Sequence, residues 1–438
     1  MLHTEHMLDA RGCGVTGATS AALDAYEAAL AAFQSWRNGA QAQLALALQA
    51  APGFVMAHVL QAYLALSSRD PKRVQSVRPV FEGAARLPVN ERERMHLAVI
   101  SAVLVDNYEL AKARFSDLLG MEPRDALALQ VAHSLDYITG DLERLNDRVA
   151  AALPAWSADL PGYHAVLAMY AFSLVECGDY ALAEQTALNA LAMNPSDARA
   201  HHVMAHVFEM TGRANAGVRW METHIDRWDT DTIVATHCWW HLALFHLEQG
   251  RADRVLQLYD QRIRAGRFSE IADMIDASSL LWRLRLRGID AGSRWAELAA
   301  AWEPHIDDGF CSFNDLHAML SFVGARDWDR ARRLKLFLEH SQSLPTRHGA
   351  TTRLLGLSAC RALIAFEKGK HALAITLLAR LPERAHRLGG SHAQRDVLHL
   401  TLLHAVQSIR RPSRSASIVT SKINKIVPAQ AAAGVMPG

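Results

Sequence analysis

The chain has 438 residues, half of them hydrophobic and 21% charged, and this composition excludes wholesale disorder and collagen-like structure. Its formal charge is +1, from 46 basic and 45 acidic residues, which argues against nucleic acid as the main partner. Histidine is unusually frequent, at 22 residues.

The segment 1–19 is predicted to be an N-terminal extension that precedes the helical region. Residues 1–10 carry acidic residues and histidines but no apolar core, so we expect no secretory signal. The longest apolar stretch, residues 97–105, is about half a membrane span, and we expect no membrane partner. The five cysteines are far apart and include no CxxC pair, which favours a reducing compartment and a cytoplasmic protein.

A helical pattern with a period of about 34 residues runs through positions 20–408. Residues 176–197 predict a helix that ends at Cys177, a turn at Gly178–Asp179, and a second helix that stops at Pro195. The second helix has small residues on one face, which allow close packing: Ala183, Ala187 and Ala190.

The same features return elsewhere in the chain. The turn glycine Gly178 recurs one period later as Gly212, and Pro195 recurs two periods earlier as Pro123. A large apolar residue, a small residue four later, a turn glycine, an aromatic-x-x-Ala and a closing proline are typical of tetratricopeptide repeats. Strand signals are nearly absent. We therefore predict an all-α, tetratricopeptide-like solenoid of helical hairpins, wound as a right-handed superhelix over residues 20–408.

Seven of the histidines lie within residues 201–246. Four of them form two pairs with i, i+4 spacing: His202 with His206, and His237 with His241. Glu209 follows the first pair on the same helical face. Trp239 has the register of a core residue, whereas Trp240 is a candidate groove residue. In this register the pairs occupy first helices of their hairpins, which line the concave groove of tetratricopeptide folds.

This histidine-rich segment permits three interpretations. Imidazoles and a carboxylate on one face can converge on a divalent metal ion, which would acidify a bound water or polarise a carbonyl. Without a metal, His and Glu can act as general acid and base near neutral pH. The histidines can also be structural or contact a ligand. The sequence assigns no metal, but if one is bound its predicted ligands are His202, His206, His237 and His241. The HExxH motif of metalloproteases is absent.

Two further polar segments, residues 313–319 and 388–400, contain candidate site residues. These are Asn314, Asp315 and His317 in the first segment, and Arg395 and Asp396 in the second. In the first, Asn314 or Asp315 can instead cap a helix. In the second, a Gly-Gly-Ser turn leads into a helix, where it can either hold an anion or serve as a loop and N-cap.

Six segments together resemble the tetratricopeptide repeat protein 38 family: DARGCGVTG, NPSDARAHHVMAHVFEM, ATHCWWHLALFHLEQG, LYDQRI, FNDLHAM and GGSHAQRDV. The resemblance covers nearly the whole chain, to about residue 406. It implies a soluble all-helical protein of a family found in bacteria and eukaryotes, and a shared groove, but no particular mechanism. The family pattern marks His202, His206, Glu209, His237, Trp240, His241, Asn314, Asp315, His317, Arg395 and Asp396.

The end of the chain departs from that pattern. No acidic residue follows Asp396, and residues 409–438 are rich in Pro, Ser and Ala, so we predict a disordered basic tail. A functional basic tail is the competing interpretation.

The leading functional hypothesis is a repeat protein that binds a small molecule or a peptide in a histidine-rich concave groove. The first alternative is an enzyme with a metal-assisted or His/Glu acid–base site in the same groove. The second is a pure protein-interaction scaffold with structural histidines.

Overall fold

The computed structural model describes residues 7–267 and 269–410, and these are predominantly helical, which confirms the all-α prediction. The described residues fall into two compact units, which we call the N-terminal unit (up to residue 273) and the C-terminal unit (from residue 274). No helix in the described part of the chain is long and apolar enough to cross a membrane. Of the predicted tail, residues 409 and 410 belong to the last helix, and residues 411–438 lie outside the described residues.

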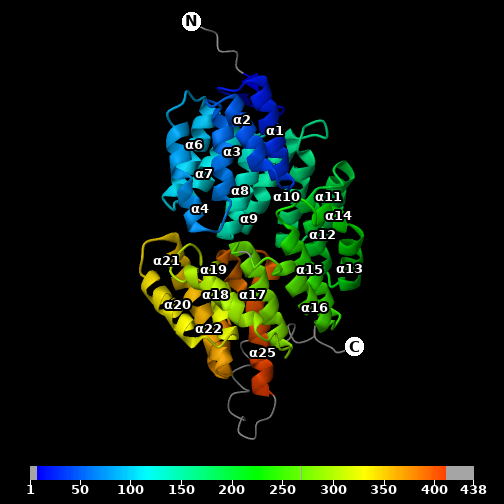
Figure 1. The fold of residues 1–438 in the computed structure, drawn as a ribbon, viewed down its shortest axis with the longest axis vertical. Coiled ribbons are helices and arrows are strands. Elements are labelled where there is room, and N and C mark those ends of the chain that lie inside the picture. Colours follow the sequence, from blue (N-terminus) through cyan, green and yellow to red (C-terminus); the bar gives the residue numbers. More distant parts are fainter. Residues whose placement is uncertain (1–6, 268, 411–438) are drawn as a thin grey trace. The chain divides into compact units, whose positions relative to one another are not determined.

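The N-terminal unit begins with a small antiparallel hairpin, β1 (Met7–Leu8) and β2 (Gly14–Val15), and continues as packed helices coloured blue to green in Figure 1. Its helices are α1 (Ser20–Gln34), α2 (Ala40–Ala50), α3 (Val55–Leu66), α4 (Pro71–Ser76), α5 (Arg78–Ala84), α6 (Glu91–Leu104), α7 (Tyr108–Met121), α8 (Ala126–Thr139), α9 (Leu142–Ala152), α10 (Tyr163–Cys177), α11 (Tyr180–Met193), α12 (Ala198–Met210), α13 (Ala214–Thr223), α14 (Ile225–Trp228), α15 (Ala235–Glu248) and α16 (Ala252–Leu258).

The C-terminal unit is also helical, and the boundary between the units falls within the first turn of α17. Its helices are α17 (Ile271–Leu286), α18 (Arg294–Trp302), α19 (Ser312–Gly324), α20 (Trp328–Ser341), α21 (Arg347–Thr351), α22 (Leu357–Glu367), α23 (His371–Leu378), α24 (His392–Arg395) and α25 (Val397–Arg410).

One type of turn joins successive helices of the N-terminal unit. Its first residue has a left-handed φ, between 67° and 88°, at Gly140, Gly178, Gly212 and Gly250. A side chain would be strained in this conformation, which explains the glycines. The next residue donates its backbone N–H to the carbonyl five positions before it, at 2.8–2.9 Å. The predicted turn at Gly178–Asp179 is of this type, and the predicted helix ends at Cys177 and Tyr180 are confirmed.

Small residues let neighbouring helices approach closely. The alanine face predicted for α11, at Ala183, Ala187 and Ala190, is fully buried. Gly217 of α13 faces the ring of Phe245 on α15, and an added Cβ would come within 2.5 Å of that ring. Larger side chains at these positions would force the helices apart, because protein interiors have few voids to absorb them.

The predicted N-terminal extension includes a segment tied into the helices. Asp9, between the two strands, accepts hydrogen bonds from the backbone N–H groups of Arg11 and Cys13 at 2.9 and 3.0 Å. Its carboxylate also lies 3.4 Å from the guanidinium of Arg92 on α6, which donates at 2.6 Å to Asp125 at the start of α8. The hairpin is therefore held by a buried ion-pair network.

Candidate functional site

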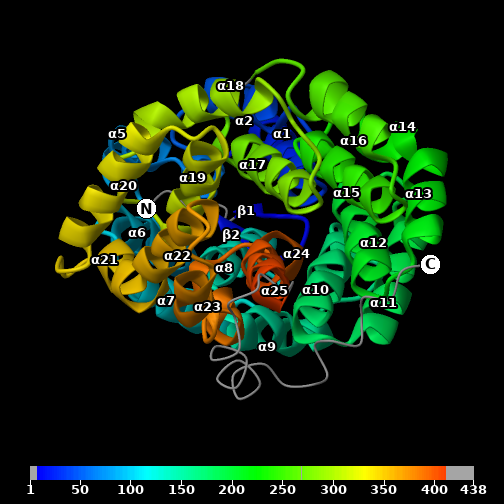
Figure 2. The ribbon, with the colours of Figure 1, turned by 90° about the horizontal axis from the view of Figure 1, so that it is seen from below.

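Two neighbouring helices of the N-terminal unit carry the predicted histidine pairs. His202 and His206 lie on α12. His237 and His241 lie on α15, which packs beside α12 (Figures 1 and 2). Asp197 is the N-cap of α12 and accepts a backbone N–H of its first turn at 3.1 Å. Because i, i+4 spacing puts both members of a pair on one face, the contact between the helices brings all four imidazoles together.

These four residues, His202, His206, His237 and His241, form what we call the histidine cluster. One ring nitrogen from each lies within 4.8 Å of the others. The shortest separation, 2.9 Å, joins the two Nε2 atoms of His202 and His206 on the same helix. Across the helix pair, the ring centroids of His206 and His241 are 4.4 Å apart. Three of the rings are buried, and His237 is partly exposed.

Glu209, one turn after His206 on α12, orients one ring of the cluster. Its Oε2 accepts a hydrogen bond from Nδ1 of His241 at 2.8 Å. The carboxylate is mostly buried and the imidazole is fully buried. A carboxylate that holds one imidazole nitrogen fixes the ring orientation and makes the other nitrogen, here Nε2, a better ligand or base.

The electrostatics of the cluster favour neutral imidazoles. Burial lowers the pKa of His202 well below its ordinary value, and the neighbouring rings of His206, His237 and His241 lower it further. The Arg199 guanidinium adds to this effect. A neutral imidazole with an available lone pair is the form that binds a metal ion.

Aromatic side chains cover the cluster. Trp240, the predicted groove residue, is fully buried and stacks on His237, with centroids 5.1 Å apart and planes 14° from parallel. Phe172 of α10 stacks on His202 at 5.8 Å and meets His206 edge-on at 5.5 Å. Such walls limit the access of water and strengthen electrostatic interactions inside them.

Arg199, one turn before His202 on α12, is buried next to the cluster. Its guanidinium lies over the ring of Trp36, 4.6 Å from the centroid. Among the residues that the structure describes, neither its Nε nor its Nη1 has a hydrogen-bond partner. Burial lowers the pKa of Arg199 to about 10, although Asp197 acts in the opposite direction, so the group remains charged at neutral pH.

Trp36 reaches the cluster through a turn that follows α1. Its ring centroid lies 5.4 Å from that of His202. The residue has a φ of 57°, which costs a non-glycine residue about 1–2 kcal/mol. The guanidinium of the next residue, Arg37, donates to three backbone carbonyls at 2.6–3.1 Å, those of Ser196, Arg227 and Thr230. These bonds overcome the strain and fix the tryptophan over α12.

Sequence reasoning missed four residues beside the cluster: Trp36, His133, Phe172 and Arg199. For Arg199 a signal existed, because the position two periods earlier in the repeat pattern is Leu127, which is fully buried. A charged residue in place of a core leucine indicates a role other than packing. The other three come from α8, α10 and the turn after α1, and their sequence spacing to the cluster has no helical regularity.

The other five predicted site residues lie in the C-terminal unit: Asn314, Asp315, His317, Arg395 and Asp396. Asp315 is buried and accepts a hydrogen bond from Nε2 of His348 at 2.8 Å, and burial raises its pKa. His317 bonds through Nδ1 to the carbonyl of Phe313 at 2.8 Å. Arg395 donates to the carbonyl of Gly390, and Asp396 is partly exposed.

The structure decides the capping alternatives for these segments. The N-cap of α19 is Cys311, and Asn314 and Asp315 lie within the first turns, so the capping role considered for them is wrong. Ser391 is the N-cap of α24, and its side chain and that of Gln394 form a reciprocal capping box, which confirms the N-cap interpretation there.

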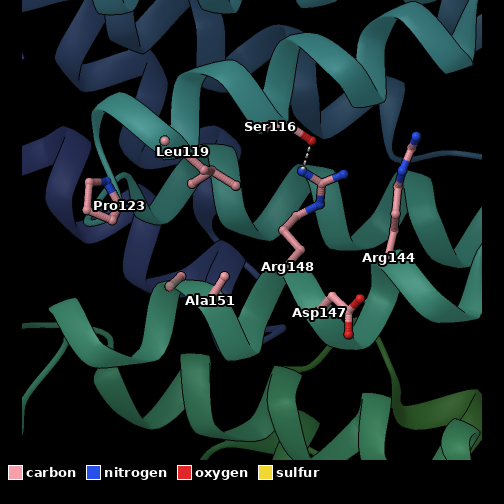
Figure 3. Close-up of a pocket in the computed structure, with 9 residues that line it drawn as sticks. Ser116, Leu119, Pro123, Arg144, Asp147, Arg148 and Ala151 are labelled. Carbon is pink, nitrogen blue, oxygen red and sulfur yellow. Dashed lines mark hydrogen bonds between the residues drawn. The ribbon is translucent and has the colours of Figure 1, made fainter.

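A separate cleft of ≈460 Å³ lies between α7 and α9 of the N-terminal unit (Figure 3). Arg148 is its most prominent side chain, and it is already bonded to Ser116 at 3.2 Å and to Asp136 at 2.7 Å. The cleft contains none of the predicted site residues. The histidine cluster is therefore the stronger candidate.

No family model matches the chain.

Proposed function

We propose that the histidine cluster binds a divalent transition-metal ion, and that the protein is a metal-dependent enzyme acting on a small molecule beside it. The observation that carries this proposal is the convergence of four ring nitrogens within 4.8 Å of one another. A metal–imidazole bond is about 2.0–2.1 Å long, so ligand nitrogens around one ion are separated by about 3–4 Å. Small rotations of the rings are enough to reach that geometry.

The donor set favours particular metals. Imidazole nitrogens suit zinc, iron, copper and nickel, whereas magnesium and calcium prefer oxygen ligands. A six-coordinate ion with four imidazoles keeps two positions for water or substrate. When bound, such an ion supplies an acidic water or a polarised carbonyl. Glu209 would hold His241 in the orientation for binding, as second-layer carboxylates do in zinc enzymes.

A specific contact also favours a metal-free alternative. The bond of 2.8 Å between His241 and Glu209 is the arrangement that a general base needs, since the carboxylate stabilises the imidazolium formed on taking up a proton. Under this alternative the same residues serve acid–base chemistry without an ion.

For the fold, we propose a tetratricopeptide-type array that resembles the tetratricopeptide repeat protein 38 family. The recurrence of one turn at the nearly evenly spaced positions Gly140, Gly178, Gly212 and Gly250 supports this proposal. The histidine cluster would then lie on first helices, which face the groove where such arrays bind small molecules or peptides. A cytoplasmic location agrees with five free cysteines, of which four are buried.

Metal analysis of the purified full-length protein tests the proposed function. We expect roughly one equivalent of a divalent transition metal in the wild type, and its loss in His202→Gln. The matched control is His201→Gln, the next residue of α12, whose ring bonds to the carbonyl of Pro195 at 3.0 Å and lies against Trp220. The control should keep the metal.

Two outcomes would contradict the metal proposal. One is a wild type that takes up no zinc, iron, copper, nickel or manganese after incubation with their salts. The other is equal metal content in His202→Gln and the wild type. An acid–base role for His241 and Glu209 would then be the better explanation of the cluster.

A further inference from the structure

Arg199 is a buried cation beside the histidine cluster, and two of its guanidinium nitrogens have no partner in the described part of the chain. The residue is 2% exposed, and its Nε and Nη1 atoms have no hydrogen-bond partner within residues 7–267 and 269–410. Buried guanidinium groups are normally paired with a carboxylate, because an unpaired charge is costly to remove from water. An unpartnered N–H of a buried cation is suited to an oxygen of a carboxylate or a phosphate, because a charged donor forms a strong hydrogen bond with a charged acceptor.

The fold does not require an arginine at this position. In α8, two repeat periods earlier, Leu127 occupies the corresponding place directly after a capping aspartate and the first helical residue, and it is completely buried. Leucine therefore satisfies the packing of such a hairpin. The arginine of α12 must be explained by something other than helix packing.

A second polar group near Arg199 complements it. His133 on α8 is buried, and its ring donates a hydrogen bond to the backbone of Met169. Its Nε2 has no hydrogen-bond partner in the described part of the chain. Burial lowers the pKa of His133 to about 3, and the charge of Arg199 contributes, so the ring is neutral and Nε2 can only accept. This acceptor suits a hydroxyl or amino group.

The two groups and the histidine cluster are linked by shared aromatic neighbours. Phe172 contacts His133 edge-on at 6.0 Å and also contacts His202 and His206. Trp36 contacts both Arg199 and His202. A small molecule bound at Arg199 would therefore be separated from the histidine cluster by no more than one aromatic side chain.

We infer that Arg199 binds the carboxylate or phosphate of a small substrate over the face of Trp36, while Nε2 of His133 accepts a hydrogen bond from a neighbouring hydroxyl or amino group. The role of this anion subsite in catalysis rests on the metal-dependent activity proposed above, but the subsite itself does not. The substrate class is a small hydroxylated or aminated acid or phosphate ester, with its reactive end at the histidine cluster.

Binding of simple probes to the full-length protein tests this inference. The probes are inorganic phosphate, acetate and glycolate, titrated by calorimetry at constant ionic strength. Glycolate differs from acetate by the hydroxyl that His133 would recognise, so it should bind more tightly. Arg199→Leu, which copies Leu127, should weaken binding of every probe at least tenfold. Arg199→Lys should retain part of the affinity, since the positive charge remains while the number and positions of the N–H donors change.

The control is Arg213→Gln, just after α12, which loses a partly exposed ion pair with Glu184 and should leave probe binding unchanged. Without ligand, Arg199→Leu should melt at the same temperature as the wild type or higher, because an unpaired buried charge is removed. A large loss of thermal stability would overturn the inference, since it would show a structural arginine.

Equal affinity of the wild type and Arg199→Leu, or no saturable binding of any probe at millimolar concentration, would also overturn it. If Arg199→Leu does not fold, Arg199→Lys decides the question by the same affinity measurement. Metal content measured in the same samples separates the two proposals. Arg199-dependent probe binding in a metal-free wild type supports the anion subsite and excludes the metal centre. A wild type that contains metal but shows no Arg199-dependent probe binding supports the metal centre and excludes the anion subsite.

Discussion

Two stretches of the N-terminal unit, separated by two repeat periods, share the same helix-capping motif. They differ in the partner of a nearby buried arginine. Asp125 caps α8, and Asp197 caps α12, each at the end of a Pro-x-Asp sequence. Each carboxylate also bonds to a histidine of an earlier helix: His96 at 2.9 Å in the first stretch and His164 at 2.7 Å in the second.

The stretches diverge in the partner of the arginine. Arg92 donates to Asp125 at 2.6 Å and lies 3.4 Å from Asp9, so its charge is balanced within the fold. Arg199 closely follows Asp197 in the sequence but turns to the ring of Trp36 instead, and no ion pair joins it to a carboxylate among the described residues. The buried charge of Arg92 is paired with carboxylates inside the fold, whereas we propose that a ligand supplies the partner of Arg199.

Breaking the buried ion-pair network of Asp9, Arg92 and Asp125 should have the largest effect on stability. Asp125→Asn keeps a capping side chain but removes the charge that Arg92 faces, which should lower the free energy of unfolding by about 3–5 kcal/mol. Asp70→Asn is the matched control, because Asp70 caps α4 without a buried arginine, and it should change stability by less than about 0.5 kcal/mol. Urea denaturation measures both. Equal effects of the two changes would contradict the comparison.

The same ion-pair network should make the free energy of unfolding depend on pH in the acidic range. Burial alone would raise the pKa of Asp125, but Arg92 and then His96 outweigh it and hold the pKa well below its usual value. The carboxylate therefore stabilises the fold fully above about pH 4, and this contribution is lost as the pH falls toward the lowered pKa. The difference in unfolding free energy between wild type and Asp125→Asn should narrow below about pH 4. A constant difference down to pH 3 would argue against this role of the Asp125 carboxylate.

A smaller change is expected at the histidine cluster. Glu209→Gln preserves the shape of the side chain but weakens its hold on His241, so metal affinity should fall by about 10–100-fold. Glu184→Gln on α11, outside the cluster, should leave the affinity unchanged. Competition with a chromogenic chelator measures both constants. Unaltered affinity in Glu209→Gln would show that the carboxylate does not support a metal ligand.

The smallest effect on stability is expected for a hydrogen bond at the edge of the buried ion-pair network. Tyr63 bonds through its hydroxyl to Nδ1 of His96 at 3.0 Å, in a fully buried position. Tyr63→Phe should cost about 1–1.5 kcal/mol, the net value of one buried hydrogen bond. Tyr180→Phe, at the partly exposed start of α11, should cost less than about 0.5 kcal/mol. Thermal unfolding followed by circular dichroism compares them, and indistinguishable melting temperatures would reject the expectation.

Local patterns in the sequence were sufficient for the helices and for part of the site. The turn at Gly178–Asp179 and the ends of α10 and α11 follow from short-range rules of turns and caps. The juxtaposition of the histidine pairs follows from i, i+4 spacing on two helices that the repeat pattern makes neighbours. These features depend on residues within one or two hairpins.

Other features depend on contacts that no local pattern encodes. Trp36 covers His202 only because Arg37 reaches the carbonyls of Ser196 and Arg227, which lie much later in the chain. The N-terminal hairpin is part of the fold because Asp9 meets Arg92, which lies beyond five intervening helices in the sequence. The repeat pattern describes each hairpin but not which side chain from a distant one completes its surroundings.

The anchoring of Trp36 has a consequence for the order of folding. Its carbonyl accepts the backbone N–H of Ile233, and Arg37 bonds to the carbonyl of Ser196, just before α12. Contacts over such separations form late, because the intervening chain must first lose its freedom. During synthesis, the turn after α1 can therefore form these contacts only after α12 and α14 have been made. The candidate site is completed only when the turn after α1 has bonded to the segment from Ser196 to Ile233.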